Sequence, residues 1–235
     1  MISLDERDRQ PELMDQPGLD DSVHRRALAG LRTVNMFSRT AGALWRGLAD
    51  MGLLTKGPVR VLDIASGGGD NVLRLAAHAR QAGVDLMAHG CDISATAVAH
   101  AQAVARQSGF ADVRYFELNA LADPLPQDYD VLMCTLFLHH LAEGDALELL
   151  RRMAAAAQRA VFVDDIVRSR FGYVLAWAGG RLLTRSPIIH VDGPLSVRSA
   201  FSLSEARELV ERAGLHRAKF RRHWPERFLM SWRKS

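Results

Sequence analysis

Residues 61–70 read VLDIASGGGD: an apolar run that ends in small residues and leads straight into a polar, helix-like segment. Small residues at such a turn let the backbone come close to a ligand. The amide groups at the start of the following helix can then bind a polar or anionic head group. A tight turn from a strand into a helix also needs glycine without any ligand, so this stretch alone leaves both interpretations open.

Outward from this loop, short apolar runs alternate with longer helical segments. We expect parallel strands at 59–64, 85–92, 113–117, 129–134 and 160–163, with helices at 71–81, 95–108, 144–157 and 203–213. Two further strands, at 218–223 and 228–232, would close the sheet as an antiparallel hairpin. The alternation predicts the α/β class, with a doubly wound, mostly parallel, seven-stranded, Rossmann-like sheet.

Two segments outside this alternation are expected to cover the site. Residues 1–55 combine a polar arm (1–20), expected to be extended or mobile, with helices at about 20–34 and 40–51. An insertion at about 168–200 follows the fifth strand and is apolar and aromatic, with Phe171, Tyr173 and Trp177. It would form the wall of an acceptor pocket, or else an ordinary packed helix with a dimer surface.

The composition favours a cytoplasmic protein with one buried core. Of 235 residues 48% are hydrophobic, and 30 basic side chains nearly balance 27 acidic ones, which does not describe a nucleic-acid binder. The N-terminus lacks an apolar signal core, so secretion is not expected. The apolar stretch 171–180 is about half of the ~20 residues that cross a bilayer, so we expect no stable membrane insertion. Cys91 and Cys134 lack a metal-binding spacing, and we interpret them as core residues.

The second and third strands each end in a polar side chain that suits an adenosine ligand. Asp92 ends the second strand, 29 residues after Asp63, where a carboxylate can accept both hydroxyls of a ribose. Asn119 ends the third strand, where its amide can face the edge of an adenine. A nicotinamide dinucleotide also carries such a ribose, but the glycines here do not spell G-x-G-x-x-G. We therefore favour an adenosine cofactor that is not a dinucleotide.

The order of these motifs resembles that of class I S-adenosylmethionine-dependent methyltransferases. The form LDIASGGGD is similar to ubiquinone and menaquinone C-methyltransferases and to small-molecule O-methyltransferases related to them. The resemblance covers about 59–163 well, and the chain from Ser202 onward more loosely. It implies S-adenosylmethionine as the cofactor and residues 56–235 as the methyltransferase domain.

The resemblance also implies which residues bind the cofactor. The loop that faces its methionine part would consist of Asp63, Ala65, Ser66, Gly67 and Gly69. The remaining contacts would be Asp92 for the ribose, Ile93, Asn119 and Ala120 for the adenine, and Thr135 against the methionine part. Two positions depart from the family, because Ala65 stands in place of its first loop glycine and Asn119 in place of an aspartate. If the N-terminal helices fold over the cofactor, Asn35 and Ser38 would lie close to it and Arg39 would meet its carboxylate.

The catalytic groups are expected at the same edge of the sheet. Methyl transfer from a sulfonium is an in-line displacement, and an oxygen acceptor usually needs a base to remove its proton. His139 and His140 follow the fourth strand, and Asp164 and Asp165 follow the fifth. We expect His140, oriented by Asp165, to be the base, and His139 to be a partly exposed residue at a helix start. Asp164 in place of Asp165, capping roles for both aspartates, and His190 as the base remain alternatives.

These residues predict methyl transfer to a hydroxyl of a small apolar acceptor of phenolic or polyketide-like chemistry. Two alternatives stay open: a carbon methyltransferase that acts on a quinone precursor, and a protein that binds the adenosyl cofactor without catalysis. We expect no metal ion, because only the adjacent Asp164 and Asp165 resemble a carboxylate site. No nucleic-acid partner is expected, and a homodimer is an open alternative.

Overall fold

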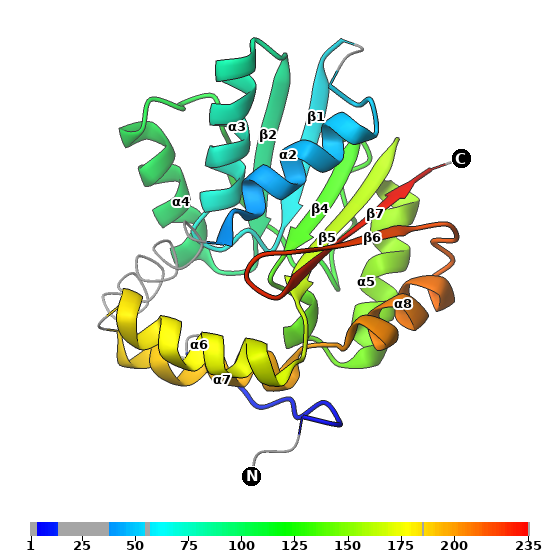
Figure 1. Cartoon of the computed structure of the whole chain (residues 1–235). Helices are drawn as coiled ribbons and strands as arrows, with labels where there is room; N and C mark the ends of the chain where they lie inside the picture. The colour runs from blue at the N-terminus through cyan, green and yellow to red at the C-terminus, as the bar shows by residue number, and fades with distance from the viewer. Residues whose placement is uncertain (1–3, 14–37, 55–56, 185, 235) are drawn as a thin grey trace.

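A seven-stranded sheet forms the centre of the computed structural model, which describes residues 4–13, 38–54, 57–184 and 186–234 (Figure 1). The strands lie in the order β3-β2-β1-β4-β5-β7-β6. Their bounds are β1 Val59–Ile64, β2 Leu86–Asp92, β3 Tyr115–Glu117, β4 Val131–Thr135, β5 Ala160–Ile166, β6 Lys219–His223 and β7 Arg227–Arg233. The first five strands are parallel, and β7 runs antiparallel to both β5 and β6. The expected doubly wound sheet and its closing hairpin are confirmed.

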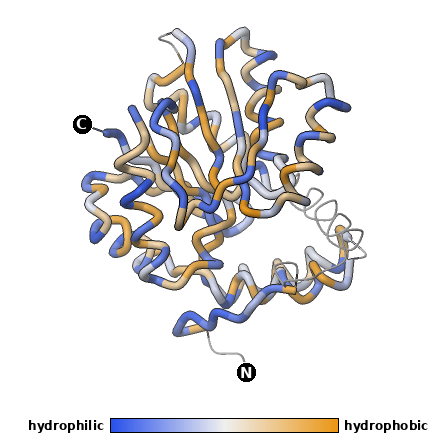
Figure 2. The backbone as a smooth tube through the Cα atoms, turned by 180° about the vertical axis from the view of Figure 1, so that it is seen from behind, coloured by the Kyte–Doolittle hydropathy of each residue, from blue (hydrophilic) through white to orange (hydrophobic). Residues whose placement is uncertain are grey.

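Helices pack on both faces of the sheet through two apolar clusters. One face is covered by α2 (Thr40–Asp50), α3 (Asp70–Ala82) and α4 (Ala95–Gln107). The other face is covered by α5 (Glu143–Ala156) and α8 (Leu203–Arg212). Figure 2 shows hydrophobic residues along the central strands, as expected for strands that are buried on both faces. Within the described ranges, no helix has the length and apolar character needed to cross a membrane.

The strand order reverses beside β1, and this reversal places the site. Strand β1 pairs with β2 on one side, where Asp63 lies opposite Gly90, and with β4 on the other, where Asp63 lies opposite Met133. In open parallel sheets, ligands bind in the crevice outside the carboxyl ends of the strands at such a point. The loop 65–69, which follows β1, lies directly in this crevice.

The insertion after β5 forms two helices. Helix α6 (Arg170–Leu183) and helix α7 (Pro187–Ser199) pack against each other at the carboxyl ends of the strands (Figure 1). The hydroxyl of Ser169 caps α6 by accepting the N–H of Gly172 at 2.9 Å. These helices therefore face the loop 65–69 from the far side of the crevice.

The N-terminal arm, residues 4–13, is extended and docked onto the molecule. It lies against α7 and against η2, a single helical turn at Leu138–His140. The guanidinium of Arg7 donates hydrogen bonds to the carbonyls of Ser199 (2.8 Å), His139 (3.2 Å) and Leu141 (3.0 Å). The expected helix at 20–34 and the expected boundary at 55–56 lie outside the described residues.

The end of β5 differs from the expectation. The strand was expected to stop at Val163, with Asp164 and Asp165 beyond it, but it continues to Ile166. Its antiparallel partner β7 supplies backbone hydrogen bonds along this extension, with Asp164 opposite Leu229. Because successive residues of a strand point to opposite faces, the two aspartates face opposite sides of the sheet.

Candidate cofactor and acceptor site

The loop between β1 and α3 has a backbone that only small residues adopt easily. Ala65 (φ 54°), Gly67 (φ 51°) and Gly69 (φ 77°) all have positive φ values. A Cβ atom on Gly69 would lie 2.6 Å from the ring of Tyr115, whose hydroxyl donates to the Gly69 carbonyl at 2.9 Å. A Cβ atom on Gly67 would have no neighbour within 4 Å. Packing therefore accounts for Gly69, whereas the space beside Gly67 is open.

Asp92 ties this loop to the start of α4. Its carboxylate accepts the N–H of Gly67 at 2.8 Å and the N–H of Ser94 at 2.9 Å. A carboxylate has about four acceptor positions, so the same group can accept hydroxyl groups of a ligand besides backbone N–H groups. The arrangement fits a ribose held directly beside the loop.

Two residues beyond Asp92 suit an adenine. The side chain of Ile93 is 68% exposed, and a flat aromatic ligand would cover it. The Oδ1 atom of Asn119 accepts the N–H of Leu121 at 3.1 Å, so the NH₂ group is the part of this amide that can donate to a ligand. The asparagine that replaces the family's aspartate would therefore bind an acceptor nitrogen of the adenine ring.

Asp63 lies beneath the loop as a buried carboxylate. It is 1% exposed, and within the described part of the chain neither of its oxygens accepts a hydrogen bond of ordinary geometry. Burial, together with the negative charge of Asp92, raises its pKa well above the ordinary value, and the hydroxyl of Thr135 offsets only part of this rise. A buried carboxylate in this state is a place where a cationic group of a ligand would be stabilised.

A cavity of about 900 Å³ brings most of the predicted cofactor residues together. Its lining includes Ala65, Ser66, Gly67, Asp92, Ile93, Asn119, Ala120 and Thr135. Three predicted residues are not part of this lining: Asp63 and Gly69 lie behind the loop, and Arg39 is exposed, so their contacts with the cofactor stay predictions. The chain turns at Arg39 (φ 56°) where α2 begins, and this turn leaves the buried Ser38 at the cavity instead. Asn35 lies outside the described residues.

The far wall of the cavity is mainly aliphatic. Helices α6 and α7 contribute the apolar side chains Leu175, Leu183, Ile189 and Val197. The expected aromatic wall was wrong, because Phe171 and Trp177 are 58% and 49% exposed and Tyr173 is not part of the lining. Among the described residues, Phe137 and Trp224 line the cavity, and both lie on other segments.

The histidine that Asp165 orients is His139. Its Nδ1–H donates to Oδ1 of Asp165 at 2.6 Å, and its backbone N–H donates to Oδ2 at 3.0 Å. Burial alone would raise the pKa of Asp165, but its contacts with His139 and with the N–H of Ile166 lower it below the ordinary value. The expected pairing of Asp165 with His140 was therefore wrong, and so was the expected exposure of His139, which is 2% exposed. Both histidines line the cavity.

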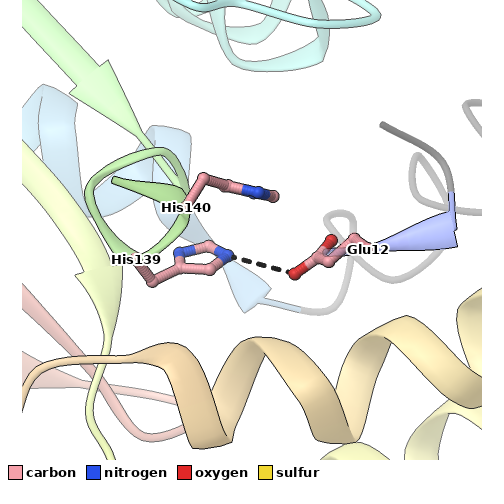
Figure 3. Close-up of side chains that lie close together, drawn as sticks. All are labelled: Glu12, His139 and His140. Carbon is pink, nitrogen blue, oxygen red and sulfur yellow. Dashed lines mark ion pairs between the residues drawn. The ribbon is translucent and has the colours of Figure 1, made fainter. Parts of the chain in front are cut away.

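Glu12 joins the two histidines from the N-terminal arm (Figure 3). Its Oε1 atom lies 3.7 Å from Nε2 of His139, and the ring centroids of His139 and His140 are 4.2 Å apart. The hydroxyl of Ser196 donates to the same carboxylate. Glu12 lies far from the histidines in the chain and within a polar arm, so no periodicity or motif could have indicated it.

The other two candidates lie away from this cluster. Asp164 accepts hydrogen bonds from His223, from Thr40 at 3.4 Å and from Arg227 at 3.5 Å, on the opposite face of β5. It therefore does not replace Asp165 as the partner of a histidine at the cavity. The Nε2 atom of His190 lies 2.8 Å from the Thr184 carbonyl, and His190 is not among the described lining residues, so the structure does not favour it as a base.

Comparison with known proteins agrees with this geometry. Residues 61–159 match the family model described as a methyltransferase domain. Over 127 residues the chain is 30% identical to a ubiquinone biosynthesis O-methyltransferase of Methylococcus capsulatus, and the match covers 54% of this chain and 51% of that protein. The chain thus spans about half the length of this curated relative.

Solved structures share the fold. A protein of Nostoc punctiforme assigned as an O-methyltransferase is 20% identical, with a TM-score of 0.62 over 85% of this chain and 57% of that one. Magnesium protoporphyrin IX methyltransferase of Synechocystis, with bound S-adenosylhomocysteine, is 18% identical, with a TM-score of 0.60 over 94% of this chain and 91% of that one. Residues 61–159 therefore match a methyltransferase domain, and the chain shares the fold of these methyltransferase structures.

Proposed function

We propose that this chain transfers the methyl group of S-adenosylmethionine to a hydroxyl of a small apolar acceptor, of phenolic or polyketide-like chemistry. The observation that carries the proposal is a single cavity of about 900 Å³ with two chemically different ends. One end has the loop 65–69 and Asp92, and the other has two histidines, a carboxylate and aliphatic walls. Such a volume, lined mostly by apolar groups with a few polar ones, is typical of small-molecule sites.

The cofactor end is formed by residues that can bind each part of the cofactor. Asp92 would accept the ribose hydroxyls, while Ile93 packs on the adenine and the Asn119 amide donates to its edge. Ser66 and Thr135 would lie along the methionine part, above the buried charge of Asp63. When bound, S-adenosylmethionine supplies an electrophilic methyl group, and the chain's task is to hold the acceptor oxygen in line with it.

The acceptor end suits a molecule with an apolar body and a hydroxyl. Leu175 and Ile189 contact the body from α6 and α7, and burial of its apolar surface contributes roughly 25 cal/mol for each Å². The hydroxyl would lie against Glu12, His139 and His140, the polar groups that the structure brings together at this end. These groups can stabilise an ionised oxygen or take its proton, and the predicted base His140 is one of them.

The activity is tested with the purified full-length chain and S-adenosylmethionine labelled in its methyl group. We expect labelled methoxy products with a panel of phenols that are un-ionised at the assay pH, identified by mass spectrometry and NMR. A Gly67→Val chain, which blocks the cofactor loop, is the matched control and should give no product. An alkali-stable product with a new C-methyl signal would contradict transfer to oxygen. Tight binding of S-adenosylhomocysteine with no product from any acceptor would indicate a cofactor-binding protein without this catalysis.

A further inference from the structure

Three side chains from two distant segments converge at the acceptor end of the cavity: Glu12 from the arm, and His139 and His140 from η2 (Figure 3). We propose that they bind one divalent transition-metal ion, such as Zn²⁺ or Fe²⁺, and that this ion holds the acceptor's hydroxyl oxygen. The role in methyl transfer rests on the proposed function, whereas binding of the ion does not. The proposal departs from the expectation of a metal-free site, which was based on carboxylates alone.

The donor atoms are close enough to share an ion. One imidazole nitrogen from each histidine and one carboxylate oxygen lie within 4.8 Å of one another. Donors bound to one ion lie about 2.0–2.2 Å from it, and hence at most ~4.4 Å from each other, so small side-chain rotations complete the site. Two imidazoles and one carboxylate favour zinc or iron over magnesium or calcium, and they leave coordination positions open.

Asp165 holds His139 in the tautomer that metal binding requires. A histidine that binds a metal almost always donates its other ring N–H to a carboxylate or carbonyl. Here Nδ1–H of His139 donates to Asp165 at 2.6 Å, so Nε2 keeps its lone pair and is the atom that lies 3.7 Å from Glu12. Asp165 is itself fixed by the N–H of Ile166 at 2.7 Å. Asp165 is thus already in place as the carboxylate that accepts the ring N–H of the metal-binding His139.

The arm that carries Glu12 is held in position on both sides of this residue. The Asp8 N–H donates to the Arg198 carbonyl at 3.0 Å, and the Leu13 N–H donates to Asp192 at 2.8 Å. The Arg9 guanidinium donates to the His140 carbonyl at 3.2 Å, which joins the arm to η2. Glu12 is buried, and a buried carboxylate needs a positive partner. A dication between Glu12 and the histidines would supply it.

At this position in the cavity, the ion would bind the hydroxyl group of the acceptor. All three ligands line the cavity, so the open coordination positions would face the acceptor. A hydroxyl bound there loses its proton to solvent more easily, because a metal lowers the pKa of an oxygen that it binds. The oxygen then forms a bond to the methyl carbon as the bond from that carbon to sulfur breaks. Acceptors with two adjacent oxygens would bind best, because both oxygens can coordinate.

The test is a metal titration of the full-length chain after dialysis against a chelator. Co²⁺ is added and followed by its visible absorption, and Zn²⁺ is then added as a competitor. We expect one equivalent to bind, with affinity reduced at least tenfold in Glu12→Gln and in His140→Ala. Asp165→Asn should reduce the affinity about 10- to 100-fold, the usual effect of removing a carboxylate behind a ligand. The exposed His216 serves as the matched control, and His216→Ala should bind like the unmodified chain.

Three further measurements make the outcome decisive. Thermal unfolding without metal identifies any variant that fails to fold. In Glu12→Gln the new side chain has the same size and shape as the one it replaces. No stoichiometric binding, or equal binding by the Glu12→Gln, His140→Ala and unmodified chains, would overturn the site and leave an ion pair of Glu12 with a protonated histidine. Methyl transfer that is lost in chelator and restored by Zn²⁺ supports the role of the ion, and undiminished transfer in chelator overturns it. S-adenosylhomocysteine binding, measured separately by calorimetry, tests the cofactor site independently.

Discussion

Replacing Asp63 by asparagine should stabilise the ligand-free chain. The carboxylate is buried beneath the cofactor loop, and burial and Asp92 raise its pKa well above the ordinary value. Asparagine keeps the shape but cannot ionise, so it removes the cost of ionising a buried carboxyl group, and the gain should be about 1–3 kcal/mol at pH 7, the size of desolvation penalties at buried polar groups. For a chain of this length, each kcal/mol raises Tm by about 2–4 °C.

The pH dependence gives the sharper test of this prediction. Because the folded-state pKa of Asp63 is raised above its ordinary value of 3.8, the folded state keeps this proton to a higher pH than the unfolded state does. The stability that this group contributes is complete below the ordinary pKa and is lost as pH rises toward the folded pKa. The difference in stability between Asp63→Asn and the unmodified chain should therefore grow with pH and then level off.

Calorimetric unfolding of both chains, from pH 4.5 to 8, measures this difference. The exposed Asp112 provides a matched control, since Asp112→Asn should change stability by less than about 0.5 kcal/mol at every pH. The same Asp63→Asn chain should bind S-adenosylhomocysteine about tenfold more weakly, because the buried charge no longer attracts the cofactor's amino group; that factor corresponds to about 1.4 kcal/mol. A chain that is less stable at pH 7, with a difference that does not depend on pH, would refute the reasoning.

Four other substitutions test the cofactor loop and the histidine cluster. Asp92→Ala should weaken S-adenosylhomocysteine binding by roughly 1.5–3 kcal/mol, the range for hydrogen bonds to a charged group, with unchanged circular dichroism; unchanged affinity in calorimetry would remove Asp92 from the site. Gly67→Val places a branched side chain at a positive φ value and toward the cavity, so binding should be abolished, and retained binding would make the loop a purely structural turn. His140→Ala should lower kcat about 10²–10⁴-fold with little change in cofactor affinity, and Asp165→Asn should lower it less. A His140→Ala rate within about threefold of the unmodified chain, with an un-ionised acceptor, would assign His140 to structure.

Much of the fold could be predicted because its signals are local. The run VRVLDI forms β1 (Val59–Ile64), and the structure confirms the expected bounds of this strand. The expected helix at 71–81 begins one residue earlier, at Asp70, because Gly69 turns the chain into the helix. The closing hairpin was also predicted, as two strands on either side of Pro225. Each of these features depends on neighbouring residues, which is why one sequence was enough.

The site was harder to predict because its partners come from distant segments. Two adjacent aspartates look like the end of an apolar strand, and only the pairing of β5 with β7 shows that the strand continues through them. The choice of His139 over His140 depends on which side chain faces β5 at the turn η2, and composition does not encode this. The position of Arg39 was hard to predict for a similar reason, because a single left-handed residue decides whether Ser38 or Arg39 meets the cavity.

The extension of β5 connects the fold to the chemistry of the cavity. On one face of the sheet, Asp164 accepts hydrogen bonds from His223 and Arg227. These bonds hold the β6–β7 hairpin against the sheet. Asp165, the next residue, faces the other way and sets the tautomer of His139. The backbone of β5 between them is itself held by β7, so the hairpin that Asp164 anchors also fixes the direction in which Asp165 points. The C-terminal strands thus position the acceptor end of the cavity through β5, although Asp165 and its histidine lie far from them in sequence.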